Sequence, residues 1–122
     1  MWDMFTYNES LTDISPLEDW NVSKVENFQY MFSYTGVSNI SALANWDVSK
    51  ATNMLGMFSN DTNLMDISSL ADWNVSNVTN ITSMFSYTGI SDISPLRNWN
   101  ISKLTNISTL FANTPISDIS AL

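Results

Sequence analysis

The stretch "DWNVSNVTN", residues 72–80, decides the fold of this chain because its pattern occurs four times. The other copies read "DWNVSKVEN" at 19–27, "NWDVSKATN" at 45–53 and "NWNISKLTN" at 98–106. The stretch also contains three overlapping Asn-x-Ser/Thr triplets, which are the acceptor signal for N-linked glycosylation. It is therefore either a cluster of modification sites or one unit of a structural repeat.

The repeat extends over the whole chain. The four tryptophans of these copies lie 26, 27 and 26 residues apart, and each is followed by Ser at +3 and Asn at +7. A Met-Phe or Leu-Phe pair stands at +11 and +12, and a block such as "ISDISPL" precedes each tryptophan. We predict a single solenoid domain over 1–122, because repeated units of this length stack on one another. Its units, about four and a half in number, are 1–19 (partial), 20–45, 46–72, 73–98 and 99–122.

Each unit carries signals for short secondary-structure elements. Trp-x-Val alternates apolar and polar residues, which predicts a short strand with one buried face. The serine that follows is an expected helix N-cap. Apolar residues then recur at i, i+3 and i+7, which predicts short helices near 25–32, 51–58, 78–85 and 104–111. The Asp-Ile-Ser block is expected to be a second strand followed by a bend. The predicted fold class is a right-handed α/β solenoid of about 4.5 coils, with short parallel strands and one short helix per coil.

Two sets of residues are expected inside the stack. The aromatic positions of the repeat are predicted to form the core: Trp20, Trp46, Trp73, Trp99, Phe32, Phe58, Phe85 and Phe111. The asparagines at +7 are predicted to form an internal amide ladder that sets the register between coils. They are Asn27, Asn53, Asn80 and Asn106.

The composition argues against several classes of function. The net charge is −8, from 12 acidic and 4 basic residues, whereas nucleic-acid binding relies on a basic surface. The chain has no Cys and no His, so it lacks the usual nucleophile, general base and transition-metal ligands. We therefore expect no enzyme activity, no catalytic or metal-binding residue, no cofactor and no nucleic-acid partner. No apolar run reaches the length of about 18 residues that a membrane span needs, so we expect none.

Three further sets of residues are candidates for interaction or modification. Tyrosines three residues after the methionine form a candidate ligand face: Tyr7, Tyr34 and Tyr87. Four asparagines are candidate glycosylation sites: Asn8, Asn60, Asn74 and Asn77. The first and last units keep apolar residues instead of a polar cap, which predicts self-association through the ends. These residues are Trp2, Met4, Phe5, Ile116, Ile119 and Leu122.

The repeated block Trp-Asp/Asn-Val-Ser, with Asn at +7 and Met-Phe at +11, resembles the DUF285-type repeats of BspA-like leucine-rich-repeat surface proteins. The resemblance covers essentially the whole chain. It departs from the usual form in the residues between Asp-Ile-Ser and the tryptophan, such as "PLR" and "ALA". It implies a leucine-rich-repeat-like solenoid in a secreted or cell-surface protein of a microbe, used in adhesion or surface interaction, with no catalytic residues.

Two functions remain open from the sequence. The first is a non-enzymatic extracellular protein that associates head to tail through uncapped ends into a filament or surface assembly. The alternative is an adhesin segment that binds a glycan or a host surface protein through the solenoid face. Only the second function requires a partner other than further copies of the same chain.

Overall fold

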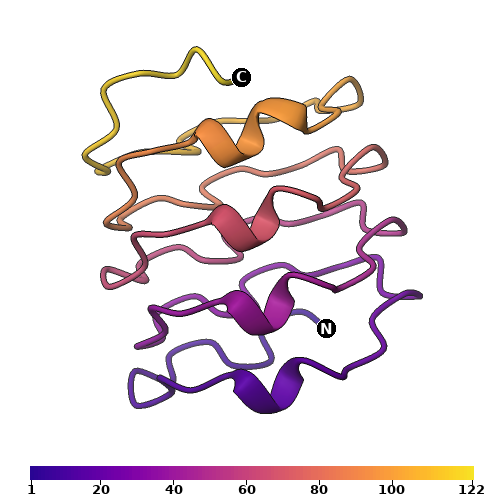
Figure 1. The fold of residues 1–122 in the computed structure, drawn as a ribbon, viewed down its shortest axis with the longest axis vertical. Helices are drawn as coiled ribbons and strands as arrows, with labels where there is room; N and C mark the ends of the chain where they lie inside the picture. Colours follow the sequence, from indigo (N-terminus) through magenta and orange to yellow (C-terminus); the bar gives the residue numbers. More distant parts are fainter.

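The chain winds into a stack of similar coils, and successive coils lie directly on one another (Figure 1). The structure is a computed structural model, and it describes all residues 1–122. The colour changes from indigo at one end of the stack to yellow at the other, so the order of the coils follows the sequence (Figure 1). The predicted solenoid is confirmed.

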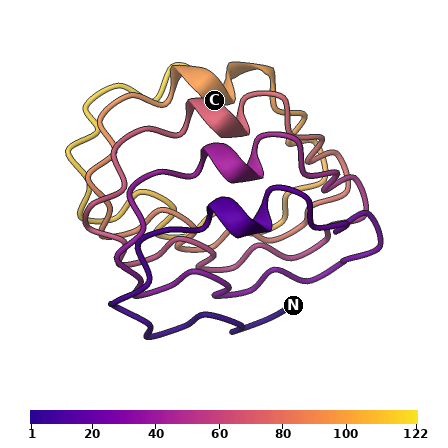
Figure 2. The ribbon, with the colours of Figure 1, turned by 60° about the horizontal axis from the view of Figure 1, so that its bottom comes forward.

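The regular elements are four short 3-10 helices that line up in one column (Figures 1 and 2). They are η1 Ser15–Leu17, η2 Ser41–Leu43, η3 Ser68–Leu70 and η4 Ser94–Asn98. An Asx turn precedes each helix; in η3, Asp66 Oδ1 accepts the Ser68 backbone N–H at 2.8 Å. Pro occupies the first turn of η1 and η4, where the missing N–H has no helical partner to lose. The Asp-Ile-Ser block therefore starts a helical turn.

The face opposite the helices is a parallel ladder of backbone hydrogen bonds. The N–H of Tyr30 donates to the Leu55 carbonyl at 2.8 Å, and that of Phe32 donates to the Met57 carbonyl at 3.0 Å. The N–H groups between these rungs bond within their own coil, as when Met31 donates to the carbonyl of Phe28, three residues earlier. Alternate residues thus bond between coils and within a coil, which satisfies the backbone without a regular strand.

The predicted α/β detail within each coil is not what the structure contains. Residues 25–32 and their equivalents form no α-helix, and the only pairings assigned there are isolated parallel bridges between successive asparagines. The apolar spacing i, i+3 and i+7 arises instead from two consecutive turns, which bring the same positions inward. The predicted strand of the Asp-Ile-Ser block is also wrong, because that block leads into the 3-10 helix. The predicted Trp-x-Val strand is also absent, and the serine that follows it caps no helix.

The core is one cluster of 30 buried apolar residues between the helix column and the ladder. Phe5, Phe32, Phe58, Phe85 and Phe111 stack along it, with successive ring centroids 5.6, 5.7, 5.9 and 5.9 Å apart. The tryptophans link coils by hydrogen bonds as well as by packing. The indole N–H of Trp73, for example, donates to the Leu43 carbonyl of the preceding coil at 2.9 Å.

Two aromatic residues predicted for the core are not buried. Trp20 is 38% exposed and Phe111 is half-buried, whereas Trp46, Trp73, Trp99, Phe32, Phe58 and Phe85 are buried. Trp20 and Phe111 belong to the outermost coils of the described chain, where no further coil covers them. Burial in a solenoid depends on the neighbouring coil, which a single unit of sequence does not reveal.

Glycines mark where neighbouring coils approach most closely. A Cβ on Gly36 would lie 2.6 Å from the Glu9 backbone oxygen, and one on Gly89 would lie 3.2 Å from the Thr62 backbone oxygen. Glu9 and Thr62 lie in the two segments between a repeat phenylalanine and the next tryptophan that are one residue longer than the other two. The extra residue of one coil therefore occupies the space that a side chain would need in the next.

Candidate functional site

The main surface depression crosses the turns of the ladder face. It has a volume of about 1000 Å³, and Tyr7, Tyr34, Asn60 and Tyr87 contribute to its lining together with small polar residues. We call it the tyrosine groove. All three residues of the predicted ligand face lie in it, although they are far apart in the sequence.

The groove is built on backbone in the left-handed region. Tyr7, Tyr34, Asn60 and Tyr87 have φ of 60°, 57°, 65° and 57°, and they occupy equivalent positions in successive coils. The turns at Tyr7 and Asn60 are closed by i to i+3 hydrogen bonds, from Asn8 N–H to the Phe5 carbonyl and from Asp61 N–H to the Phe58 carbonyl. This conformation costs a residue with a side chain about 1–2 kcal/mol. The equivalent residue adopts this conformation in every coil, so it is a property of the repeat.

The tyrosine rings face solvent. Tyr7 is 71% exposed, Tyr34 38% and Tyr87 51%. Tyr7 and Tyr34 stack with their centroids 4.7 Å apart and their planes inclined by 21°. The rings therefore form a platform on the surface and are not packed beneath the turn.

A second column of left-handed residues lies two positions before the phenylalanines, and Gly56 is its only glycine, with φ 59°. The Tyr30 ring of the preceding coil lies where a Gly56 Cβ would be, so the glycine makes room for this ring on the groove wall. Gly56 thus adopts the left-handed conformation without strain and leaves space for the Tyr30 ring.

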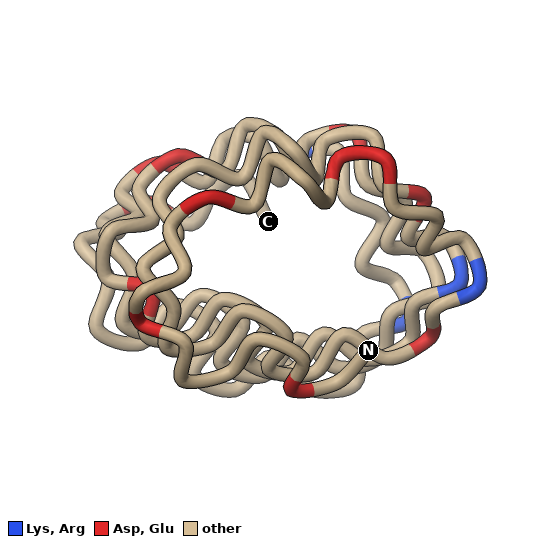
Figure 3. The backbone as a smooth tube through the Cα atoms, turned by 90° about the horizontal axis from the view of Figure 1, so that it is seen from below, with Lys and Arg blue, Asp and Glu red and all other residues tan.

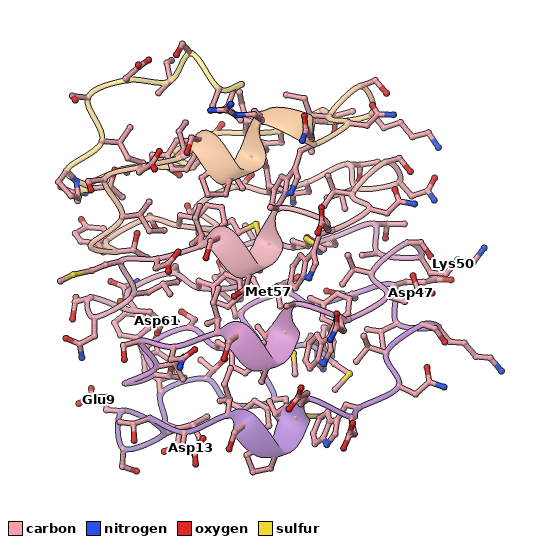
Figure 4. The ribbon with its side chains drawn as sticks, in the orientation of Figure 1. Glu9, Asp13, Asp47, Lys50, Met57 and Asp61 are labelled. Carbon is pink, nitrogen blue, oxygen red and sulfur yellow. The ribbon has the colours of Figure 1, made fainter.

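The groove contains no basic side chain. Its lining includes one acidic residue, Asp3, and otherwise tyrosine, serine, threonine and asparagine. Seen along the stack, basic residues lie mainly at one edge of the ring, whereas acidic residues are spread around it (Figure 3). Side chains drawn as sticks place Lys50 and Asp47 on one side of the stack and Glu9 and Asp61 on the other (Figure 4). The groove is therefore suited to uncharged polar ligands rather than to anions.

Asp61 is a buried carboxyl group that the sequence analysis does not single out. Its Oδ1 accepts hydrogen bonds from Thr35 N at 2.8 Å and from Thr35 Oγ1 at 3.0 Å, while its Oδ2 has no partner. Burial raises the pKa of Asp61 to about 8, against the lowering effect of those two bonds. The signal that could have revealed it is a repeat position held by Thr35, Thr88 and Thr114 in other units.

The asparagines at +7 do not form the predicted internal amide ladder. Asn27, Asn53 and Asn80 are half-buried and Asn106 is exposed, and it is their backbones that pair between coils. Each side-chain Oδ1 accepts the N–H of the second residue that follows, as in the 3.0 Å bond from Leu55 to Asn53. Asx turns of this kind need no partner asparagine, so each amide oxygen serves its own coil. Asn53 Nδ2 in addition donates to Gln29 Oε1 of the preceding coil at 3.2 Å.

The same Asx turn explains why glycosylation triplets are so frequent. Asn74 Oδ1 accepts the Ser76 backbone N–H at 3.2 Å and the Ser76 hydroxyl at 2.7 Å. Where such a turn uses Asn rather than Asp, the sequence reads Asn-x-Ser and matches the acceptor triplet. Among the candidate glycosylation sites, Asn8 and Asn74 are exposed, whereas Asn60 and Asn77 are half-buried. Asn77 also donates to the Ser49 carbonyl and accepts from Lys103 Nζ. Glycosylation at these four residues stays a prediction.

The aspartates that lie two positions before a serine serve as turn acceptors. Hydrogen bonds from a serine two residues later lower the pKa values of the following residues below the ordinary value for aspartate: Asp13, Asp47, Asp66, Asp92 and Asp118. No group of three or more acidic side chains lies close enough together to hold a metal ion. No helix has the length and hydropathy that would let it cross a membrane.

The predicted self-association residues occupy the two ends of the stack. Trp2, Met4, Ile119 and Leu122 are 67%, 47%, 65% and 44% exposed. Phe5 and Ile116 are half-buried, and Phe5 stacks on Phe32.

The comparison with known proteins gives the family. The sequence pattern of a family described as "Mycoplasma protein of unknown function, DUF285" matches residues 1–41 and 33–120. The chain belongs to the DUF285 family. Its resemblance to BspA-like leucine-rich-repeat proteins is thereby confirmed at the level of the repeat.

The DUF285 chain was also compared with curated proteins and with solved structures. No curated protein matches it. Among solved structures it is similar to internalin C2 from Listeria monocytogenes, with 22% identity and a TM-score of 0.39. The similarity covers 91% of the DUF285 chain and 61% of the internalin chain, so this chain spans less than two thirds of that protein.

Proposed function

We propose that this chain is a non-enzymatic, ligand-binding part of a microbial surface protein, located outside the cell, and that it binds through the tyrosine groove. The observation that carries the proposal is the row of solvent-facing tyrosines on left-handed turns. Three large aromatic side chains are exposed there, two of them stacked at 4.7 Å, on backbone that costs stability to maintain.

The chemistry of the groove favours recognition over reaction. Tyrosine supplies a rigid aromatic face and a hydroxyl at a low cost in conformational entropy, which makes it a common residue of binding surfaces. The aspartates of the repeat are engaged as turn acceptors rather than paired for proton transfer, as in Asp92, whose two oxygens accept from Ser94. A surface location follows from the family's resemblance to BspA-like proteins and is part of the proposal.

The test is binding of the fluorescently labelled chain to cultured epithelial cells, measured by flow cytometry. We expect saturable binding that falls at least tenfold when Tyr7, Tyr34 and Tyr87 are all replaced by alanine. The matched control is Met65→Ala, which removes another exposed side chain, 66% exposed, outside the groove. Circular dichroism verifies that both variants fold. Absence of saturable binding, or equal loss in the control, would contradict the proposal.

A second candidate function is head-to-tail self-association, and Trp20 favours it. Trp46, Trp73 and Trp99 each donate their indole N–H to a leucine carbonyl of the preceding coil. Trp20 is 38% exposed and has no such acceptor in the described chain. A coil stacked before this one, from a longer chain or from a second copy, would supply the acceptor.

Leu122 offers the complementary position at the other end of the stack. It lies 26 residues after Leu96 in the same repeat block, where leucine carbonyls accept an indole N–H from the next coil. A second copy that placed Trp20 over this carbonyl would extend the stack without closing it, which gives filaments. Sedimentation velocity of the 122-residue chain tests this candidate. We expect association that Trp20→Arg abolishes, and a strictly monomeric chain at high concentration would exclude it.

A further inference from the structure

One interruption in the tyrosine row creates a slot. The equivalent positions in successive coils hold Tyr7, Tyr34, Asn60, Tyr87 and Asn113, so Asn60 lies between two tyrosines. The ladder fixes their order, because Tyr34 N–H donates to the Ser59 carbonyl at 3.0 Å and Asn60 N–H donates to the Ser86 carbonyl at 2.8 Å. All three residues have φ between 57° and 65°, so their side chains leave the turn in the same way.

The slot has room for one ring. Tyr34 and Tyr87 are two coils apart, which corresponds to about 10 Å for a ladder with a spacing of about 4.8 Å per coil. Tyr7 and Tyr34, on adjacent coils, are already stacked at 4.7 Å and leave no such space. A ring between Tyr34 and Tyr87 would have an aromatic face on both sides and the Asn60 amide beneath it.

The groups that line the slot are free to bind. The Asn60 side chain and the hydroxyls of Tyr34 and Tyr87 make no hydrogen bond within the chain, whereas the neighbouring Ser33 and Ser59 hydroxyls bond to each other at 2.7 Å. The amide offers both a donor and an acceptor. No Lys or Arg lines the groove, so a carboxylate or sulfate would find no positive partner.

These properties match a neutral sugar ring. A pyranose has apolar C–H faces, which stack on aromatic rings, and an edge of hydroxyl groups that both donate and accept hydrogen bonds. We propose that Tyr34, Asn60 and Tyr87 form a binding site for one neutral pyranose residue of a glycan. The inference rests on the proposed function, for which it names the ligand class.

The chain itself offers the variant that closes the slot. Asn60→Tyr installs the residue that three equivalent positions already hold at the same φ, so the turn is expected to fold unchanged. The new ring would fill the gap between Tyr34 and Tyr87. Asn113→Tyr is the matched control, because it adds a tyrosine at the same kind of turn, φ 57°, beyond Tyr87 and leaves the slot open.

The probes are the methyl glycosides of glucose, galactose and N-acetylglucosamine, with sialic acid as the charged comparison. Binding is measured by saturation-transfer NMR, on protein made without glycosylation so that Asn60 is unmodified. We expect millimolar binding of at least one neutral sugar. Asn60→Tyr is expected to weaken it at least tenfold, and Asn113→Tyr less than twofold. Binding of none of the neutral sugars, stronger binding of sialic acid, or an unchanged Asn60→Tyr variant would overturn the inference.

Periodate treatment of the epithelial cells separates this inference from the proposed function. Periodate oxidises glycans and leaves most protein surfaces intact. Loss of cell binding after treatment supports a sugar ligand. Cell binding that survives treatment, yet still depends on the three tyrosines, would overturn the sugar ligand and favour a peptide while leaving the proposed function standing.

Discussion

Replacing Asp61 by asparagine should remove most of the pH dependence of stability between pH 4 and pH 8. The Asp61 carboxyl is fully buried, accepts two bonds from Thr35 and leaves Oδ2 without a partner. Burial raises the pKa of Asp61 from 3.8 to about 8. The folded chain therefore keeps a proton that the unfolded chain has released. Because the folded state binds more protons in this range, stability falls as the pH rises.

The size of the effect follows from the two pKa values. A pH of 7 lies about three units above the pKa of the unfolded carboxyl. The free energy of unfolding is therefore about 4 kcal/mol lower at pH 7 than at pH 3.8. This is a large part of the total free energy of unfolding of an ordinary domain, which is about 5–15 kcal/mol. Asparagine keeps an oxygen for Thr35 and cannot ionise, so the variant should lose less stability between pH 5 and pH 8.

Urea denaturation at pH 5, 6, 7 and 8 measures the effect. The free energy of unfolding of the natural chain should fall over this range, and that of Asp61→Asn should change little. Asp66→Asn is the control, since Asp66 is exposed and hydrogen bonds from Ser68 hold its pKa below 3.8. Groups with lowered pKa values add stability that is lost only as the pH falls below about 4. Equal slopes for the natural chain and Asp61→Asn would refute the assignment of Asp61 as a buried, neutral carboxyl.

Three further predictions concern the joints between coils, each measured by urea denaturation at pH 6. Trp73→Phe keeps an aromatic ring but leaves the Leu43 carbonyl without its indole partner, so it should cost about 1–3 kcal/mol. Gly36→Ala places a methyl group 2.6 Å from the Glu9 backbone oxygen and should destabilise by about 1–3 kcal/mol, although alanine would otherwise favour folding. Asp66→Ala removes an Asx-turn acceptor and should cost about 1 kcal/mol. A neutral result at any of the three positions would contradict the contact assigned to it.

The repeat could be predicted from sequence because period is independent of conformation. The spacing of Trp46, Trp73 and Trp99 required equivalent positions to stack, and these three side chains are indeed buried in register. The conformation within a unit could not be predicted in the same way. A helix and a pair of turns both bring Phe28 and Phe32 to one side, so apolar spacing does not distinguish them. What excludes the helix is the left-handed Tyr30 between them, with φ 52°, and tyrosine carries no signal for that conformation.

The groove was partly foreseeable. The position of Tyr7, Tyr34 and Tyr87 in the repeat indicated that they would lie on one face, and they line one groove. The importance of Asn60 depends on what lies on either side of it in space, which appears only when the coils are stacked. Asp61 shows the opposite case, because a charged residue in a link between apolar blocks is ordinarily exposed.

The alternation of bonds on the ladder face has a mechanical consequence. Bonds such as Tyr30 N–H to the Leu55 carbonyl join coils along the axis of the stack, so tension between the two ends loads the coils in series rather than side by side. Each coil that detaches would release the chain between equivalent positions, 26 residues from Trp20 to Trp46, or about 90 Å of contour length. A protein attached to a surface at one end and to a ligand at the other would thus lengthen in equal steps, and the remaining coils would stay folded while it did so.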